Sequence, residues 1–179
     1  MRLLYGIFNY KQDRLIKHRK TFIKHSIPRL VTGEISVILV NMNMDGDTGF
    51  REIEHTADWE LEVWAKDLPS LLEQAGRGMY LLAGFKLQAG PRVSRSFKLA
   101  VNDNESLLVD FLSELLWIAE HEGLAFDAYD LSIDINWLNA KLDGAPITCF
   151  SKEIKAVTYH NLNIINSGDG LQVRIVFDV

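Results

Sequence analysis

The most regular strand pattern in the 179-residue chain is WELEVWA, residues 59–65. Apolar residues at positions 59, 61, 63 and 65 alternate with two glutamates and a tryptophan, the period of two expected of a strand with one buried face. The residues directly before this strand read EHTAD, positions 54–58. Because loops held by a rigid sheet often carry binding residues, Asp58 is a candidate site residue at the start of the strand.

Two helices are expected on the C-terminal side of this strand. The first begins at Asp67, a residue type that caps helix N-termini, and ends at Gly84, which favours a helix stop. Between them, apolar residues follow helical spacing at Leu68, Leu71, Leu72, Ala75, Met79 and Leu82. Gly76 and Gly78 weaken the middle of this helix, which indicates close packing against a neighbour. The second helix is expected at about residues 105–122.

Strand patterns fill most of the remaining sequence. Alternating apolar residues predict strands at 93–101, 131–137 and 171–177. Turn signals occur at Asp143-Gly144 and at residues 167–170, which read SGDG. Two helices among many strands, with successive strands close in sequence, predict an α+β fold rather than a doubly wound parallel sheet.

The last strand pattern provides a second candidate site residue. If the alternating apolar residues from Leu171 to Phe177 face the core, the residues between them face the other way, so Asp178 is not forced into the core. The sequence ends at Asp178-Val179. Two aspartates and a main-chain terminal carboxylate are hard oxygen ligands of the kind that Ca²⁺ or Mg²⁺ prefers. The alternative for a single aspartate near a strand end is a turn or cap hydrogen bond.

Four ordered blocks of the sequence resemble the archease family: GFREIEHTAD at 49–58, LLVDFL at 107–112, IKAVTYH at 154–160 and VRIVFDV at 173–179. The resemblance implies a small metal-binding accessory protein, not itself an enzyme, which activates the RtcB-type RNA ligase of tRNA splicing and RNA repair by promoting guanylylation of that ligase. It further implies two small strand-helix-strand-strand modules, one inserted in the other and sharing one core.

The resemblance also implies roles for individual residues. Asp58, Asp178 and the terminal carboxylate of Val179 match the family positions that bind a divalent metal, with Ca²⁺ the expected ion. Lys155 is a candidate for activation of the ligase, although a solvated strand lysine is the ordinary alternative. His55 is a second such candidate, as a metal ligand or a group that orients one; the alternative is a structural imidazole that fixes the loop, because calcium avoids nitrogen ligands.

The charge of the chain is divided unevenly. Residues 1–48 hold eight Lys or Arg and four Asp or Glu, a balance of +4, whereas residues 49–179 hold 11 and 20, a balance of −9. We interpret 1–48 as a poorly ordered or misannotated leader, with Met42 or Met44 as the true start; the alternative is a basic stretch that coats RNA or a membrane surface. The acidic remainder, 49–179, would repel phosphates and is not expected to bind nucleic acid directly.

Other features restrict the compartment and the chemistry. One cysteine, Cys149, rules out an internal disulfide and fits a reducing cytoplasm, and no apolar run is long enough to span a bilayer. Cys149 with His121 or His160 would make a nucleophile and base, but a lone cysteine is usually a small buried residue. No GxSxG, P-loop, HExxH or GxGxxG motif occurs. The alternative functions are a metal-dependent hydrolase and a general chaperone of nucleic-acid-processing proteins.

Overall fold

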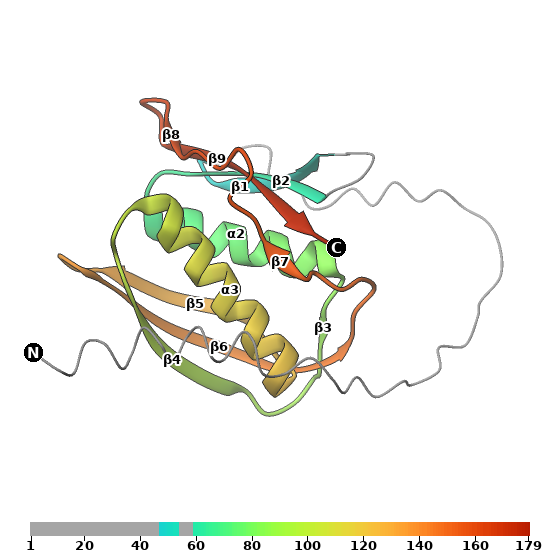
Figure 1. Ribbon diagram of the computed structural model, residues 1–179. Coiled ribbons are helices and arrows are strands. Elements are labelled where there is room, and N and C mark those ends of the chain that lie inside the picture. The colour runs from blue at the N-terminus through green and yellow to red at the C-terminus, as the bar shows by residue number, and fades with distance from the viewer. Residues whose placement is uncertain (1–46, 54–58) are drawn as a thin grey trace, which may run out of the picture. The chain divides into compact units, whose positions relative to one another are not determined.

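The computed structural model describes residues 47–53 and 59–179, which form two antiparallel sheets with two helices between them (Figure 1). The first sheet has the order β1 (Gly49–Ile53), β2 (Trp59–Ala65), β9 (Leu171–Asp178) and β7 (Ala156–Val157), and β8 (Ile165–Asn166) also pairs with β9. The second sheet has the order β3 (Lys86–Leu87), β6 (Trp137–Cys149) and β4 (Val93–Ala100), and β5 (Leu124–Ile133) also pairs with β6. The strands of the second sheet are therefore inserted in sequence between those of the first, and the predicted α+β class is confirmed.

The two helices lie where the sequence predicts them. In α2 (Leu68–Ala83) the side chain of Asp67 accepts a hydrogen bond from the backbone N–H of Ser70 at 2.8 Å, and Gly84 ends the helix in the left-handed conformation at φ 69°. In α3 (Asn104–Glu122) the side chain of Asp103 accepts from the N–H of Ser106 at 2.7 Å. These bonds satisfy backbone donors that a helix N-terminus leaves without partners.

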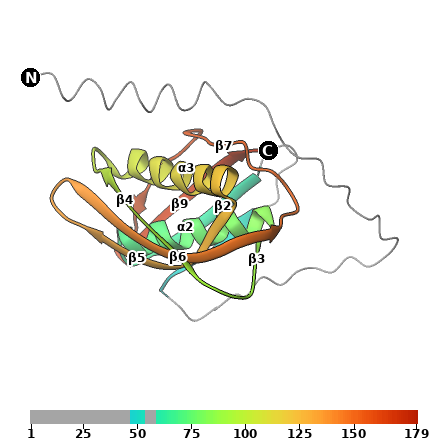
Figure 2. The ribbon, with the colours of Figure 1, turned by 90° about the horizontal axis from the view of Figure 1, so that it is seen from below.

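Each helix has a buried face, because a sheet lies on each side of the helix pair. The helices lie side by side in both views (Figures 1 and 2), and α2 packs against β2 of the first sheet and β5 of the second. A Cβ atom at Gly78 would lie 2.6 Å from a methyl carbon of Leu61, and one at Gly76 would lie 3.0 Å from a methyl carbon of Leu115. The two glycines therefore permit the close approach that their position in the sequence predicted.

The apolar face of the first sheet points at the helices, and no other helix or sheet of the described residues packs on its opposite face. Leu61 and Val63 on β2 and Ile175 and Phe177 on β9 are buried in a single core that includes residues of both sheets and both helices. The intervening residues of β9 face outward, and Asp178 is exposed. The alternation in the sequence therefore predicted the two faces of this sheet correctly.

Two predictions in the second sheet were wrong. The alternation at 131–137 is not one strand: β5 ends at Ile133, a tight turn follows in which the N–H of Asp134 donates to the carbonyl of Trp137 at 3.0 Å, and β6 begins. Ile135 is 94% exposed as a result. Asp143-Gly144 is not a turn but lies inside β6, where Gly144 lets the strand approach the backbone of Ala125 closely.

No helix in the described part of the chain is long and apolar enough to cross a membrane.

Candidate functional site

Three chain segments meet at the C-terminal end of β9. The antiparallel register pairs Phe177 with Trp59 at the start of β2, and Asp178 with Ala156 at the start of β7. β9 lies between β2 and β7, so Asp178 and Val179 lie at the strand-end edge of the first sheet, where the chain end is marked in Figure 1. Strand pairing fixes the backbone there, so side chains at this edge are held by a rigid support.

Lys155 contacts the last two residues of the chain. Its ammonium Nζ donates to the main-chain oxygen of Val179 at 2.7 Å, and its backbone N–H donates to the carbonyl of Asp178 at 2.8 Å. Its neighbour Ile154 and the nearby Val157 are buried, while the Lys155 side chain is exposed. Lys155 is therefore outside the core, but it is not a lysine that only solvent contacts.

The site presents oxygen atoms from two adjacent residues. Asp178 is exposed and places its carboxylate on the outward face, and Val179, which packs partly against the core, contributes its main-chain oxygen. Both are hard donors that suit Ca²⁺ or Mg²⁺. The other expected residues, Asp58 and His55, lie outside the described residues. Within 47–53 and 59–179 no group of three or more His, Cys, Asp or Glu side chains gathers, so the metal site stays a prediction.

The segment 150–155 connects the two sheets beside this edge, and we call it the bridging segment. It leaves β6 and wraps the C-terminal end of α2, where the carbonyl of Ala83 accepts hydrogen bonds from the N–H of Ser151 at 2.9 Å and from its hydroxyl at 3.1 Å. The ammonium of Lys152 lies 4.1 Å from the ring centroid of Trp59, a cation–π contact. Sequence reasoning missed this contact, because residues so far apart in the chain leave no periodic signal.

A second feature that the sequence did not reveal is a buried carboxylate on the outward face of the first sheet, the face opposite the helices. Glu62 is only 2% exposed, although the alternation of β2 points it outward. Arg51 and Arg174 lie directly across from it on the flanking strands and both donate to its carboxylate, as does the side-chain amide of Gln172 at 3.0 Å. The carboxylate is thus covered by its own partners.

The arginines determine the charge state of Glu62. Burial raises the pKa of this carboxyl, but the hydrogen bonds and positive charges of Arg51 and Arg174 outweigh burial, so the pKa lies below its usual value of 4.5. Glu62 is therefore ionised at neutral pH. The strand pattern alone predicted an exposed glutamate, and the register that brings two arginines beside it is a tertiary property.

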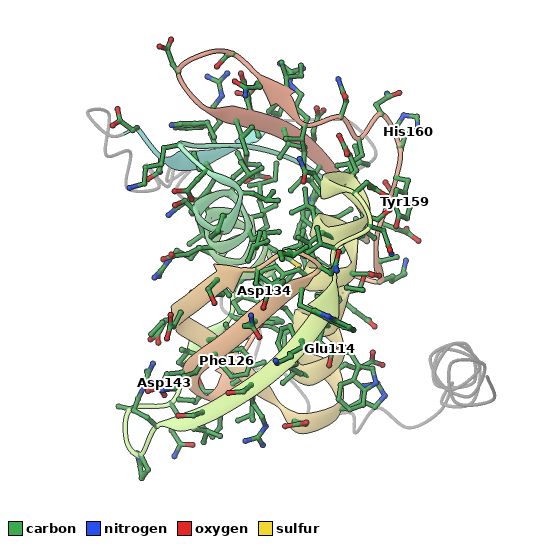
Figure 3. All side chains as sticks on the ribbon, turned by 90° about the vertical axis from the view of Figure 1, so that its left-hand side faces the viewer. Glu114, Phe126, Asp134, Asp143, Tyr159 and His160 are labelled. Atoms are coloured by element: carbon green, nitrogen blue, oxygen red, sulfur yellow. The ribbon has the colours of Figure 1, made fainter. Side chains whose placement is uncertain are left out.

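The structure does not bring the cysteine and histidines together as a nucleophile and base. Cys149 is exposed at the end of β6. His121 on α3 contacts the carbonyl of Trp117 at 3.0 Å, and His160 contacts the side-chain amide of Asn161 at 3.0 Å. Figure 3 shows His160 and its neighbour Tyr159 on the outside of the segment after β7. No hydrogen bond within the described residues joins either imidazole to Cys149.

Sequence comparison relates the chain to one family. Residues 50–179 match the Archease protein family. The chain is 31% identical over 140 residues to the protein archease of Methanosarcina barkeri, covering 73% of this chain and 95% of the relative. It is 27% identical over 138 residues to the protein archease of Methanothermobacter thermautotrophicus, covering 73% and 99%. The matched region contains the whole of the described fold from Phe50 onward.

Solved structures agree with this relationship. The solution structure of a protein from Methanobacterium thermoautotrophicum superposes with a TM-score of 0.59 at 26% identity, covering 73% of this chain and 99% of that protein. The crystal structure of an archease from Thermotoga maritima, described as a possible chaperone, superposes with a TM-score of 0.56 at 27% identity, covering 72% and 96%. The two sheets and two helices are therefore shared with proteins of this family.

Proposed function

Because the chain belongs to the archease family, we propose that it is a metal-binding accessory protein that activates an RtcB-type RNA ligase by promoting its guanylylation in tRNA splicing or RNA repair. The protein itself does not catalyse the RNA reaction in this account. Its role is to present the end of β9 and the residues around it to the ligase.

The observation that supports this proposal best is the arrangement of Lys155, Asp178 and Val179. A lysine whose side chain lies outside the core is held at 2.7 Å from an oxygen of the last residue, next to an exposed carboxylate. A charged group that is both fixed and accessible suits contact with a partner protein. The core does not need this lysine, so a role in recognition explains its position better than a role in folding.

The proposed metal ligands are Asp58, Asp178 and Val179. Trp59, the residue after Asp58, pairs with Phe177, the residue before Asp178, and this pairing supports the choice of the two aspartates as ligands of one ion. Their oxygens match the donor preference of Ca²⁺. When bound, the ion supplies positive charge that offsets the repulsion between these carboxylates. Lys155 donates to the main-chain oxygen of Val179.

The proposed partner is a protein rather than bare RNA. The region 49–179 has a balance of −9, and a negative body repels the phosphate backbone. The ionised Glu62 between Arg51 and Arg174 further uses two of the cations of this region for internal pairing. The charge distribution therefore gives little support to direct binding of RNA by this region.

A turnover assay tests the proposal against its alternatives. Purified RtcB-type ligase is assayed on a nicked RNA substrate with and without this protein, and the protein is also incubated with RNA alone and with an unrelated aggregating protein. The proposal predicts faster ligation and no change in the other two samples. Cleavage of RNA by the protein alone would favour the hydrolase, and suppressed aggregation without faster ligation would favour the general chaperone.

A further inference from the structure

The bridging segment has features of a protein interaction surface. We infer that it docks on the ligase, with Phe150 as the apolar anchor and Lys152 as a charged contact at the rim. The identity of the partner rests on the proposed function. The surface itself is indicated by the exposure of Phe150, by its packing against Phe85 and by the lysines around it.

Phe150 is a large aromatic side chain that is exposed but well supported. It is 51% exposed, and its ring packs edge-on against Phe85 with centroids 6.0 Å apart. Phe85 in turn packs against the buried Tyr80 at 5.2 Å. The hydrogen bonds of Ser151 to Ala83 fix the backbone directly after Phe150. An exposed aromatic group that is already ordered loses little conformational entropy on binding, which is a property of interface hot spots.

The lysines around Phe150 make no ion pair with an acidic side chain of the described residues. Within 47–53 and 59–179, every arginine takes part in an ion pair with a carboxylate: Arg51, Arg77, Arg92, Arg95 and Arg174. No ion pair joins a lysine to an acidic side chain within the same residues, and three of these lysines lie here. Lys86 pairs in register with Cys149, next to Phe150, and Lys152 and Lys155 belong to the bridging segment.

This pattern favours an acidic protein surface with an apolar pocket as the occupant. Lysines that make no ion pair with an acidic side chain of the described residues give charge complementarity to carboxylates of a partner, and an aromatic centre with a charged rim is the usual composition of a protein interface. Single-stranded RNA is the weaker candidate, because every nucleotide carries a phosphate and a continuous strand would meet exposed Glu153 and Asp178, whereas a protein can place single carboxylates opposite the lysines. Lys155 belongs both to the bridging segment and to the proposed site at the end of β9. Docking through the bridging segment would therefore place that site against the ligase.

Two pairs of matched variants test the inference in the full chain. Phe150→Ala is compared with Trp137→Ala, which removes an aromatic side chain of similar exposure, 48%, from the opposite end of β6. Lys152→Glu is compared with Lys141→Glu, an exposed lysine on the outer face of the second sheet. Affinity for the purified ligase is measured by fluorescence anisotropy, with calcium affinity and thermal unfolding recorded for each variant. Lys152→Glu keeps the test valid if Phe150→Ala lowers stability, because Lys152 is exposed.

The inference predicts that Phe150→Ala and Lys152→Glu each weaken ligase binding about tenfold or more, while Trp137→Ala and Lys141→Glu change it by less than about twofold. Calcium affinity should stay the same in Phe150→Ala, Trp137→Ala and Lys141→Glu. Wild-type affinity in both Phe150→Ala and Lys152→Glu, with wild-type protein still accelerating the ligase, would overturn the docking surface and leave the proposed function intact. A wild-type protein that neither binds nor accelerates the ligase would overturn both.

Discussion

The ammonium of Lys155 donates to the main-chain oxygen of Val179 at 2.7 Å, across 24 positions of sequence. The contact exists because β7 pairs with β9 and brings residue 155 beside the last two residues. A cation is thus fixed next to the oxygens that we propose as metal ligands. This contact links the two parts of the proposed function, metal binding and partner activation. The two can be measured separately.

Replacement of Lys155 by Ala is expected to lower ligase activation without unfolding the protein. The exposed side chain leaves no core cavity, so the free energy of unfolding should change by no more than roughly 0.5 kcal/mol. Calcium affinity should rise roughly threefold, because a positive charge beside the metal site is removed. Ligase turnover, calorimetric calcium titration and thermal unfolding measure the three quantities.

Lys98→Ala is the matched control, since Lys98 is an exposed strand lysine on the other sheet. It should leave activation and calcium affinity unchanged. If Lys155→Ala activates the ligase as well as the wild type does, Lys155 is an ordinary solvated lysine.

Neutralising either proposed aspartate ligand should weaken calcium binding. Asp58→Asn and Asp178→Asn each keep the shape of the side chain and remove one negative charge, so affinity for Ca²⁺ should fall about tenfold or more in both. Adding one or two residues after Val179 should have a similar effect, because it converts a carboxylate into a neutral peptide group. Calorimetric titration with Ca²⁺ and Mg²⁺ compares these proteins with the wild type.

Asp169→Asn provides the control, as Asp169 is an exposed aspartate in the turn between β8 and β9. An extended chain that binds calcium as tightly as the native one would show that Val179 does not use a terminal carboxylate as a ligand. An N-terminal tag should have no effect in the same titration.

The buried Glu62 predicts a specific dependence of stability on acid. Its pKa is lowered in the folded protein relative to the usual 4.5, so its ionised form stabilises the fold fully above that value. The contribution is lost as the pH falls through the lower folded pKa. Glu62→Gln should reduce the free energy of unfolding at pH 7 by about 1–3 kcal/mol, and the loss should shrink in acid.

Urea unfolding at several pH values below and above 4.5 measures this difference. Glu120→Gln, at an exposed position of α3, should change stability little at any pH in the range. A Glu62→Gln protein as stable as the wild type at pH 7 would show that the ion pairs of Glu62 with Arg51 and Arg174 do not stabilise the fold.

Removal of residues 1–43 is expected to leave a functional protein. These residues lack the alternating and capped patterns of the later sequence, and residues 1–48 carry a charge of opposite sign to 49–179. A chain that starts at Met44 should unfold at the same temperature, bind calcium and activate the ligase as the full chain does. Loss of soluble protein on truncation would show that the removed segment belongs to the core.

Local signals in the sequence predicted the helices and the first sheet well. The caps at Asp67 and Gly84 depend only on neighbouring backbone, and the inward residues of β9 depend only on the alternation of a strand. The hairpin between β5 and β6 was missed because alternation continues across its turn, so Ile135 and Trp137 appeared to extend the strand. Gly144 was misread as a turn residue because a glycine needed for close packing looks the same in sequence.

The candidate site was only partly predictable for a different reason. Asp178 was placed outside the core by alternation alone, and that placement is confirmed. The contact between Lys155 and Val179, the cation–π pair of Lys152 with Trp59, and the burial of Glu62 all depend on pairing between distant segments. No local pattern encodes such pairings, so they become visible only in the folded chain.

The most direct test of the central claim is the rate at which the ligase becomes guanylylated. Purified RtcB-type ligase is mixed with GTP labelled in the α-phosphate, and the covalent ligase–GMP product is followed over time with and without this protein. We expect a faster rate with the wild-type chain, and a smaller increase with Lys155→Ala. An unchanged rate of guanylylation in the presence of the correctly folded, calcium-loaded wild-type protein would contradict the account.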